Sequence, residues 1–301
     1  MSSDLFFIGI DGGGTKCRAR LEDVDGNVLG EGVSGPANIM RDSDLAKASI
    51  VDAINIAISN AGNANTFEQI SLSQCVVGAG LAGANIESAK QQFEQWQHPF
   101  HSLHVLSDLH AACVGAHNGN PGAAIIIGTG SSGTMWQDES FQDVGGHGFP
   151  IGDKASGAWL GLKAVQHTLL CLDELEEKDE LAAEVCNALQ SSCTQEIVAK
   201  CAEFNTHHYA ALVERMLPLL YTKQNKVTAL FEEGALYIER MAKRLLANHN
   251  HCLAMIGGLS NVYSAYFSES IKARLVPCKA TPQQGAIYHA KAAFNHKEGE
   301  K

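Results

Sequence analysis

A glycine-rich turn between two apolar segments places the strongest constraint on how this chain folds. The stretch FFIGIDGGGTKCRARLEDVDG covers residues 6–26. Its apolar run ends at Asp11, and after Gly14 apolar and polar residues alternate with a period of two, which is typical of a half-buried strand. A dinucleotide-binding fingerprint needs a helix directly after its glycines, and neither GxxxxGKS nor GxxxxGKT, the Walker sequences, occurs in the chain. The turn is therefore predicted to be the tip of a β-hairpin.

Glycines at a hairpin tip let backbone N–H groups approach an anionic ligand, because a Cβ would block the approach. If the ligand is a phosphate, Thr15 and Lys16 can reach its oxygens, and Asp11 can hold the water shell of a metal ion. A tight hairpin turn without any ligand explains this one segment equally well. The predicted nucleotide-binding residues at this tip are Asp11, Gly12, Gly13, Gly14, Thr15 and Lys16.

A second segment has the same layout and favours the phosphate interpretation. In IIIGTGSSGTMW, residues 125–136, an apolar run ends at a glycine turn and a further strand is predicted after it. The pattern restarts after HNGNPG at residues 117–122, so the two segments read as a weak internal repeat. Two such hairpins can hold a nucleotide between two domains. The predicted residues of the second tip are Gly128, Thr129, Gly130 and Ser131.

The length of 301 residues is that of two domains. We predict an N-terminal domain over residues 1–118 and a C-terminal domain over residues 119–281, with a final helix over residues 282–301 that packs back on the first. Apolar residues at intervals of three and four predict an earlier helix over residues 45–61, which ends near Gly62. Its apolar face is expected to consist of Leu45, Ala48, Ile50, Ala53, Ile54, Ala57 and Ile58.

Composition excludes several classes of function. The formal net charge is -11, and a nucleic-acid backbone would be repelled unless the chain had a basic patch, which the sequence does not show. The sequence has neither the pattern of a signal peptide nor an apolar run of membrane-spanning length, so we expect a cytoplasmic protein without a membrane partner. The nine cysteines form no CxxC pair and are expected to be reduced. We expect no metal site at Cys186, Cys193 and Cys201, nor at His98, His101, His104 and His110.

Five segments taken together resemble the superfamily of sugar kinases, Hsp70 and actin. In chain order they are IGIDGGGTK, LSDLHAACVGA, IIIGTGSSG, AMIGGLSN and TPQQGAIYHA. Within the superfamily the chain is most similar to the BadF/BadG/BcrA/BcrD group, and in particular to the N-acetylglucosamine and glucosamine kinases. The resemblance implies an α/β fold of two ribonuclease-H-like domains with an interdomain ATP cleft, the actin-like ATPase fold. It also implies ATP and Mg²⁺ as cofactors and Gly257 and Gly258 as the adenosine loop.

Asp108 has two possible roles. Asp108 follows a predicted strand over residues 102–106 and opens a predicted helix, where Asp commonly serves as an N-cap. The resemblance implies instead that Asp108 is the general base that takes the proton from the sugar 6-hydroxyl. We assign Asp108 to this catalytic role, and we assign both Asp11 and Asp108 to the metal site.

Three loops are candidates for sugar binding. Asn38 in SGPANIM can both donate and accept hydrogen bonds, and GAGLAGAN, residues 78–85, can bring backbone N–H groups close to a sugar ring. In GGHGFPIGDKASGAWLG, residues 145–161, the resemblance implies sugar binding by Gly146, Asp153 and Gly157, although Asp153 could also cap the following helix. In the kinases that the chain resembles, an aromatic residue stands at the position of His147. The predicted substrate residues are Asn38, Gly83, Asp108, Gly146, His147 and Asp153.

The predicted function is ATP-dependent phosphorylation of the 6-hydroxyl of N-acetylglucosamine, and a glucosamine kinase is the alternative. More remote alternatives are an iron–sulfur ATPase that activates a dehydratase, a sugar-responsive repressor and an ATP-binding scaffold without turnover. None of the nine cysteines is suggestively placed for an iron–sulfur cluster, and the first strand starts at Phe6, before which a repressor would need a DNA-binding domain. The expected partners are a small-molecule amino sugar and a second copy of the chain in a homodimer.

Overall fold

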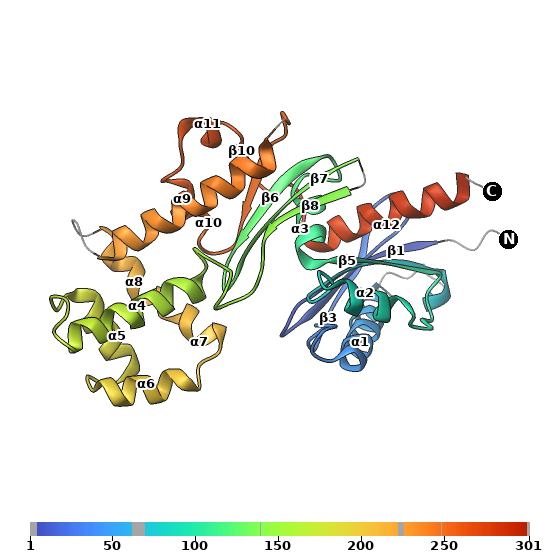
Figure 1. Ribbon diagram of the computed structural model, residues 1–301. Helices are drawn as coiled ribbons and strands as arrows, with labels where there is room; N and C mark the ends of the chain where they lie inside the picture. Colours follow the sequence, from blue (N-terminus) through green and yellow to red (C-terminus); the bar gives the residue numbers. More distant parts are fainter. Residues whose placement is uncertain (1–4, 62–69, 139, 222–225, 248, 300–301) are drawn as a thin grey trace. The chain divides into compact units, whose positions relative to one another are not determined.

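The computed structural model describes residues 5–61, 70–138, 140–221, 226–247 and 249–299. By the contacts between its residues, the chain separates into two compact units (Figure 1). Unit 1 consists of Met1–Gly122, Trp136–Phe141 and Pro277–Lys301, and unit 2 consists of Ala123–Met135 and Gln142–Val276. Gly62 and the last two residues of the predicted final helix lie outside the described residues.

Unit 1 contains a five-stranded sheet in the order β3-β2-β1-β4-β5. Strand β1 pairs antiparallel with β2 and parallel with β4, and β4 pairs parallel with β5. The strand that the sequence predicts after the glycine turn is therefore confirmed. The elements of this unit are β1 (Phe6–Gly12), β2 (Cys17–Glu22), β3 (Val28–Ser34), α1 (Ser43–Ala61), a 3₁₀ turn (Leu72–Gln74), β4 (Cys75–Leu81), α2 (Glu87–Glu94), β5 (Ser102–Ser107), α3 (Asp108–Ala116) and α12 (Pro282–Gly299).

The two faces of this sheet are covered by different helices. Alternate residues of a strand point to opposite faces, and Ile8 belongs to the same core cluster as Ile50 of α1, whereas Phe7 packs with Ile287 of α12. Figure 1 shows α1 and α12 on opposite sides of the sheet. The predicted face of α1 is confirmed at Ile50, Ala53, Ile54 and Ala57, and it is wrong at the start of the helix, where Leu45 and Ala48 are exposed. The buried residues of α1 are Ala46, Ser49, Ile50, Ala53, Ile54, Ala57 and Ala61.

Helix α12 approaches the sheet closely because glycines line the contact. A Cβ added at Gly9 of β1 would lie 1.9 Å from the backbone oxygen of Gln283, and one at Gly78 of β4 would lie 2.0 Å from that of Ala286. On the helix itself, a Cβ at Gly285 would lie 2.0 Å from the backbone oxygen of Ala111 in α3. The C-terminal helix is thus fixed to β1, β4 and α3 by backbone-to-backbone packing.

Unit 2 repeats the same strand order around β6. Its sheet has the order β10-β9-β6-β7-β8, so β6 takes the place that β1 has in unit 1, in agreement with the predicted repeat. A large apolar cluster packs helices α4, α5 and α9 around this sheet. The elements are β6 (Gly122–Ile127), β7 (Ser131–Gln137), β8 (Ser140–Gly145), α4 (Gly157–Leu172), α5 (Glu180–Leu189), α6 (Thr194–Ala202), α7 (Thr206–Ala211), α8 (Val213–Met216), a 3₁₀ helix (Leu217–Tyr221), α9 (Lys226–Leu246), β9 (Leu253–Ile256), α10 (Ser260–Ser264), α11 (Glu269–Lys272) and β10 (Leu275–Val276).

Several boundaries differ from the predictions. The strand predicted at Ser73 begins at Cys75, because Ser71 caps a 3₁₀ turn over the intervening residues. Strand β7 begins at Ser131, so this residue belongs to the strand and not to the turn. Strand β8 was not predicted. The structure has no disulfide, since all nine cysteines are free.

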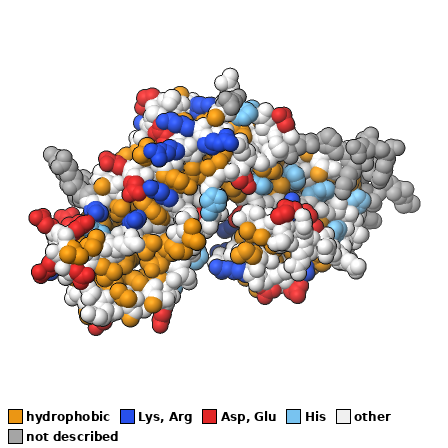
Figure 2. Space-filling view, viewed as in Figure 1, with side chains coloured by type: hydrophobic (Ala, Val, Ile, Leu, Met, Phe, Trp, Pro, Cys, Tyr) orange, Lys and Arg blue, Asp and Glu red, His pale blue; other side chains and the backbone are white. Residues whose placement is uncertain are grey.

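On the face shown in Figure 2, basic and acidic side chains lie interspersed among hydrophobic ones. No helix in the described parts of the chain is long and apolar enough to cross a membrane.

Candidate active site

A backbone hydrogen bond closes the turn of the first glycine tip, and the space around Gly14 is open. The N–H of Gly13 donates to the backbone oxygen of Lys16 at 2.9 Å. A Cβ added at Gly14 would meet no atom within 4 Å, whereas one at Gly12 would lie 2.6 Å from Cδ2 of Leu81. Among the described residues, the N–H groups of Gly14 and Thr15 donate no backbone hydrogen bond. The tip therefore has free donors and room for an anionic ligand, while Gly12 is required by packing.

Asp11 and Asp108 lie at the same edge of the unit 1 sheet. Strands β1, β4 and β5 are parallel, Asp11 is in register with Gly80, and Leu81 is in register with Ser107. In open α/β sheets this carboxyl-terminal edge is where ligands bind. Burial raises the pKa of Asp108, and the negative charge of Asp11 raises it further.

Asp11 has a partner that the sequence analysis did not identify. Its Oδ2 lies 3.3 Å from Nη1 of Arg18, which faces it across the hairpin register. Burial raises the pKa of Asp11, and the charge and hydrogen bond of Arg18 oppose this rise. The predicted hairpin could have revealed Arg18, because antiparallel pairing of the two strands around the glycine turn places Arg18 opposite Asp11.

Asp108 is not the N-cap of α3. That cap is Ser107, whose hydroxyl accepts a hydrogen bond from the N–H of His110 at 3.1 Å. Asp108 is the first helical residue, and its Oδ1 accepts from the N–H of Leu109 at 2.9 Å. Although the Asp108 side chain is exposed, the crowding of protein atoms around its carboxyl raises its pKa. The capping alternative therefore fails, which leaves Asp108 available for chemistry.

Two of the predicted sugar-binding residues of unit 1 lie side by side. Oδ1 of Asn38 accepts from the N–H groups of Met40 and Arg41 at 3.1 and 3.0 Å, so the carbonyl side of its amide is used within the loop. Gly83 has a φ of 88°, and a Cβ there would lie 3.0 Å from Oδ1 of Asn38. The N–H of Ile39 donates to the backbone oxygen of Ala82 at 3.1 Å and ties the two loops together.

The second glycine tip is built on the start of helix α4. The N–H of Gly128 donates to the backbone oxygen of Gly130 at 2.9 Å, and a Cβ at Gly128 would meet no atom within 4 Å. The first N–H groups of α4, those of Gly157 and Ala158, donate to the backbone oxygens of Gly128 and Thr129 at 2.8 and 3.2 Å. The helix start thus holds the tip in place, and the role of Gly157 here is structural.

The Asp153 loop lies directly against this tip. Oδ1 of Asp153 accepts from the N–H of Gly148 at 3.2 Å, and a Cβ at Gly130 would lie 2.8 Å from Oδ2 of Asp153. The N–H of Gly146 donates to the backbone oxygen of Ser131 at 3.1 Å. The structure therefore brings Gly146 and Asp153 together with the second tip, and the adjacent His147 is exposed.

The electrostatics of Asp153 resemble those of the carboxylates of unit 1. Burial raises its pKa, and hydrogen bonds from the N–H groups of Gly148 and Ser131, together with His147, oppose the rise. Asp153 does not cap α4, because the hydroxyl of Ser156 accepts from the N–H of Trp159 at 3.1 Å and is the N-cap. Trp159 is only 8% exposed and belongs to the core, as predicted.

The predicted adenosine loop lies beside the second tip. Strand β9 pairs parallel with β6, with Ile256 opposite Ile126, so Gly257 follows β9 where Gly128 follows β6. Gly257 has a φ of 101°, and a Cβ there would lie 2.3 Å from the backbone oxygen of Ile127. The hydroxyl of Ser260 donates to the backbone oxygen of Gly257 at 2.7 Å. Only glycine fits this position.

Comparison with known proteins identifies the family. A sequence model of the BadF/BadG/BcrA/BcrD ATPase family matches residues 8–287. The chain belongs to this family. The resemblance inferred from the five segments is thereby confirmed, and membership implies the use of ATP.

The chain is also similar to individual kinases in sequence and in structure. It is 32% identical over 286 residues to the glucosamine kinase of Vibrio cholerae, which covers 95% of each chain. It is 28% identical over 200 residues to the N-acetylmuramic acid/N-acetylglucosamine kinase of Clostridium acetobutylicum, which covers 64% of this chain and 63% of the relative. A crystal structure from Chromobacterium violaceum, provisionally described as an N-acetylglucosamine kinase, has a TM-score of 0.85 at 28% identity and covers 95% of this chain and 99% of that one. The predicted two-domain α/β fold is confirmed.

Proposed function

We propose that this chain is an ATP-dependent kinase that phosphorylates the 6-hydroxyl of an amino sugar. The observation that carries the proposal is the position of Asp108, which stands with Asp11 at the carboxyl edge of a parallel sheet and is released from capping by Ser107. The candidate substrates are N-acetylglucosamine, which we predict from the resemblance, and glucosamine as the alternative. The Vibrio cholerae relative, which matches 95% of the chain, gives glucosamine equal standing.

The residues at the two tips fit a nucleotide with its metal. Gly14 and Gly128 each have open space where a side chain would stand, which suits the close approach of phosphate groups. In our proposal Gly13, Gly14, Thr15 and Lys16 contact the phosphates together with Gly128–Ser131, and Gly257 and Gly258 adjoin the adenosine. Asp11, with Asp108 near it, holds the water shell of Mg²⁺. The metal supplies neutralisation of the phosphate charge during transfer.

Asp108 accepts the proton of the sugar hydroxyl in this proposal. A general base works best when its pKa is near the operating pH, so the raised pKa of Asp108 suits this role better than an ordinary carboxyl would. In phosphoryl transfer the remaining rate enhancement comes from positioning and charge neutralisation. The proton passes to an oxygen of Asp108 as the hydroxyl oxygen bonds to the γ-phosphorus, while the bond from this phosphorus to the β–γ bridging oxygen breaks and ADP leaves.

We assign sugar recognition to two groups of residues. In unit 1 these are Asn38 and Gly83, which are held together by the contact between Ile39 and Ala82. The N–H₂ side of the Asn38 amide has no hydrogen-bond partner among the described residues and suits a sugar hydroxyl, because the carbonyl side is used within its own loop. In unit 2 they are Gly146, His147 and Asp153, in the loop that adjoins the second tip.

The nine free thiols support a reducing compartment such as the cytoplasm. That the chain forms a homodimer stays a prediction.

The function is tested by ADP release from ATP and Mg²⁺ in the presence of glucose, glucosamine, N-acetylglucosamine or N-acetylmannosamine. We expect sugar-dependent ADP release with the highest kcat/KM for glucosamine or N-acetylglucosamine. If ADP release is the same with and without each of the four sugars, the proposal is wrong.

A further inference from the structure

A cluster of metal-ligand side chains lies in unit 2 where helices α4 and α5 meet. His167 and Cys171 are four residues apart, which places them on the same face of α4. Asp179 is the N-cap of α5 and accepts from the N–H of Ala182 at 2.9 Å. The imidazole, thiol and carboxylate ligand atoms of the three residues all lie within 4.8 Å of one another. The sequence analysis missed this group because its members share no recognised spacing.

Two distances in the cluster, those from Nε2 of His167, are near the ligand separations of a tetrahedral zinc site. Nε2 of His167 lies 2.8 Å from Oδ2 of Asp179 and 3.4 Å from Sγ of Cys171. Zinc bonds of about 2.0–2.3 Å at tetrahedral angles separate neighbouring ligand atoms by roughly 3.3–3.6 Å. The thiol is already at that separation, and the carboxylate needs to move by about half an ångström. Such a shift is small for a side chain that is 31% exposed.

His167 faces a carboxylate at each of its two nitrogens although it is 5% exposed. Nε2 faces Asp179, and Nδ1 lies 2.8 Å from Oε2 of Glu176 but off the direction needed for a hydrogen bond. Within the described part of the chain this buried nitrogen therefore lacks a well-directed partner. A neutral imidazole has one N–H and cannot donate to both carboxylates. A cation at Nε2 resolves this conflict, since the single proton then stays on Nδ1 and can be donated to Glu176. Ligating histidines commonly have such an outer carboxylate.

We propose that this corner of unit 2 binds a zinc ion through Nε2 of His167, Sγ of Cys171 and Oδ2 of Asp179. Glu176 orients His167, and Lys226 lies 3.4 Å from Glu176 on the outer side. A water molecule completes the four ligands. On binding, the Cys171 thiol releases its proton to solvent and gives up its present hydrogen bond to the backbone oxygen of Glu177, which is 3.1 Å long.

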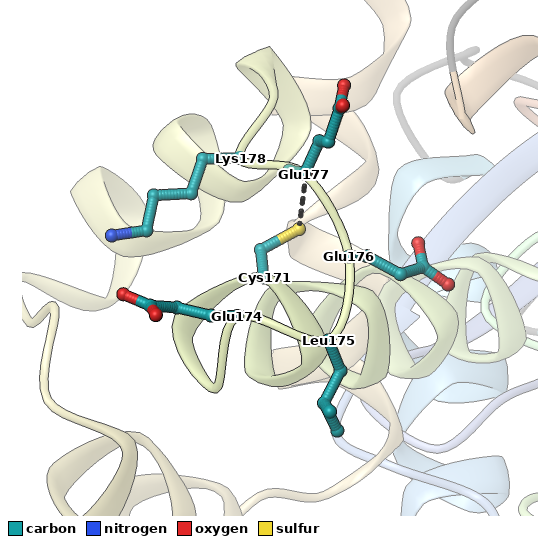
Figure 3. Close-up of a pocket in the computed structure, with 6 residues that line it drawn as sticks. All are labelled: Cys171, Glu174, Leu175, Glu176, Glu177 and Lys178. Atoms are coloured by element: carbon teal, nitrogen blue, oxygen red, sulfur yellow. Dashed lines mark hydrogen bonds between the residues drawn. The ribbon is translucent and has the colours of Figure 1, made fainter.

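The site has a route to solvent. A pocket of about 370 Å³ is lined by Cys171 and by the loop residues Glu174, Leu175, Glu176, Glu177 and Lys178. Figure 3 shows the sulfur of Cys171 pointing from α4 toward this loop. Cys171 is fourteen residues from the start of α4 at Gly157, which corresponds to roughly 21 Å along a helix. The ion would therefore stabilise the corner between α4 and α5 and would take no part in chemistry at the second tip.

Zinc and cobalt binding to the chelator-treated full chain tests the proposal independently of kinase activity. We expect one equivalent of Zn²⁺ per chain by calorimetry, a higher melting temperature with zinc, and a thiolate-to-cobalt absorption band with Co²⁺. Asp179→Asn keeps an N-cap and should weaken zinc binding at least tenfold, and Glu176→Gln should weaken it by about 10–100-fold. Cys171→Ser should remove the cobalt band.

The matched control is Cys186→Ser, which removes a partly buried thiol of the neighbouring helix α5 and should leave the affinity and the cobalt band unchanged. The proposal is overturned if the wild-type chain binds no stoichiometric zinc. It is also overturned if Asp179→Asn and Cys171→Ser bind zinc as the wild type does, because the ion would then be held by other groups.

Discussion

The hydroxyl of Ser107 accepts a hydrogen bond from the backbone N–H of His110 at 3.1 Å, and this contact determines what the next residue can do. With the cap of α3 supplied by Ser107, Asp108 keeps one carboxylate oxygen on the N–H of Leu109 and presents the group at the carboxyl edge of the sheet. Structural and chemical roles are thus divided between two adjacent residues, and mutations at them should separate stability from turnover.

Replacing Asp108 with asparagine should lower kcat by about 10²–10⁴-fold, because a positioned general base typically contributes that much. The fold should be retained with an unchanged or higher melting temperature. The folded-state pKa of Asp108 is raised, so its contribution to stability is present below the unfolded-state pKa and is lost as the pH rises through the folded-state value. At neutral pH the ionised carboxylate opposes folding, and asparagine removes that effect. Turnover and thermal unfolding of the same preparation measure both quantities, and near-wild-type turnover would exclude Asp108 as the base.

Ser107→Ala is the matched variant at the adjacent position. Loss of an N-cap hydroxyl costs about 1 kcal/mol of unfolding free energy. We expect chemical denaturation to show this loss, while kcat falls far less than in Asp108→Asn. A collapse of kcat in Ser107→Ala with unchanged stability would mean that the two roles are assigned to the wrong residues.

The pH dependence of kcat/KM should carry the signature of the raised carboxyl pKa. Since the base must be ionised, activity should fall on acidification at a pH above the usual aspartate value of about 3.9. The carboxyl of Asp153 also has a raised pKa, but in our account it takes no proton from the sugar. The acidic limb should therefore persist in the Asp153→Asn variant. If the acidic limb disappears in Asp153→Asn, the titrating group is Asp153.

Gly14→Ala tests the first tip as a phosphate site. The added methyl group would meet no protein atom within 4 Å, so the melting temperature should not change. It would occupy space that we assign to phosphate, and KM for ATP should rise by about tenfold, equivalent to about 1.4 kcal/mol. Gly9→Ala provides the contrast, because its methyl group would lie 1.9 Å from the backbone oxygen of Gln283 and should destabilise the fold by at least about 1–3 kcal/mol. An unchanged KM for ATP in Gly14→Ala would contradict a phosphate at this tip.

Asp153→Asn should raise KM for the sugar more than KM for ATP. Helix α4 keeps its Ser156 cap in this variant, and asparagine can still accept the hydrogen bond from Gly148, so the loop should stay folded. Steady-state kinetics with each substrate varied in turn separates the two effects. A rise in KM for ATP alone would place Asp153 with the nucleotide, which its proximity to Gly130 makes the natural second assignment.

Local periodicity was sufficient to predict the fold at the glycine tips. The alternation that begins at Cys17 reflects real strand pairing with β1, and the second tip could be predicted for the same reason. The apolar face of α1 was misplaced only at its N-terminal end, because alanine and serine supply much of its buried surface there and hydrophobicity alone does not distinguish Ala46 from Ala48. Strand β8 was missed since the segment SFQDVG has little alternation and is half-buried.

The carboxylates of the candidate site could be proposed from the sequence because each follows or precedes a recognisable element. Their partners were not predicted. The contact of Arg18 with Asp11 depends on the register of the hairpin, and the identity of a helix cap depends on which of two adjacent side chains, such as Ser107 and Asp108, takes that position. The group of His167, Cys171 and Asp179 is a tertiary arrangement that joins one helix to the cap of the next. No spacing rule applied to the chain reveals it.

The central claim is transfer of the ATP γ-phosphoryl group to the 6-hydroxyl of an amino sugar, and the product itself tests it most directly. The wild-type chain should be incubated with ATP, Mg²⁺ and either glucosamine or N-acetylglucosamine, and phosphorus–proton correlation spectroscopy should locate the phosphate. We predict ADP and sugar phosphate in equal amounts, with the phosphorus coupled to the protons on C6. A phosphate on any other carbon, or inorganic phosphate as the only phosphorus product besides ADP, would contradict the account.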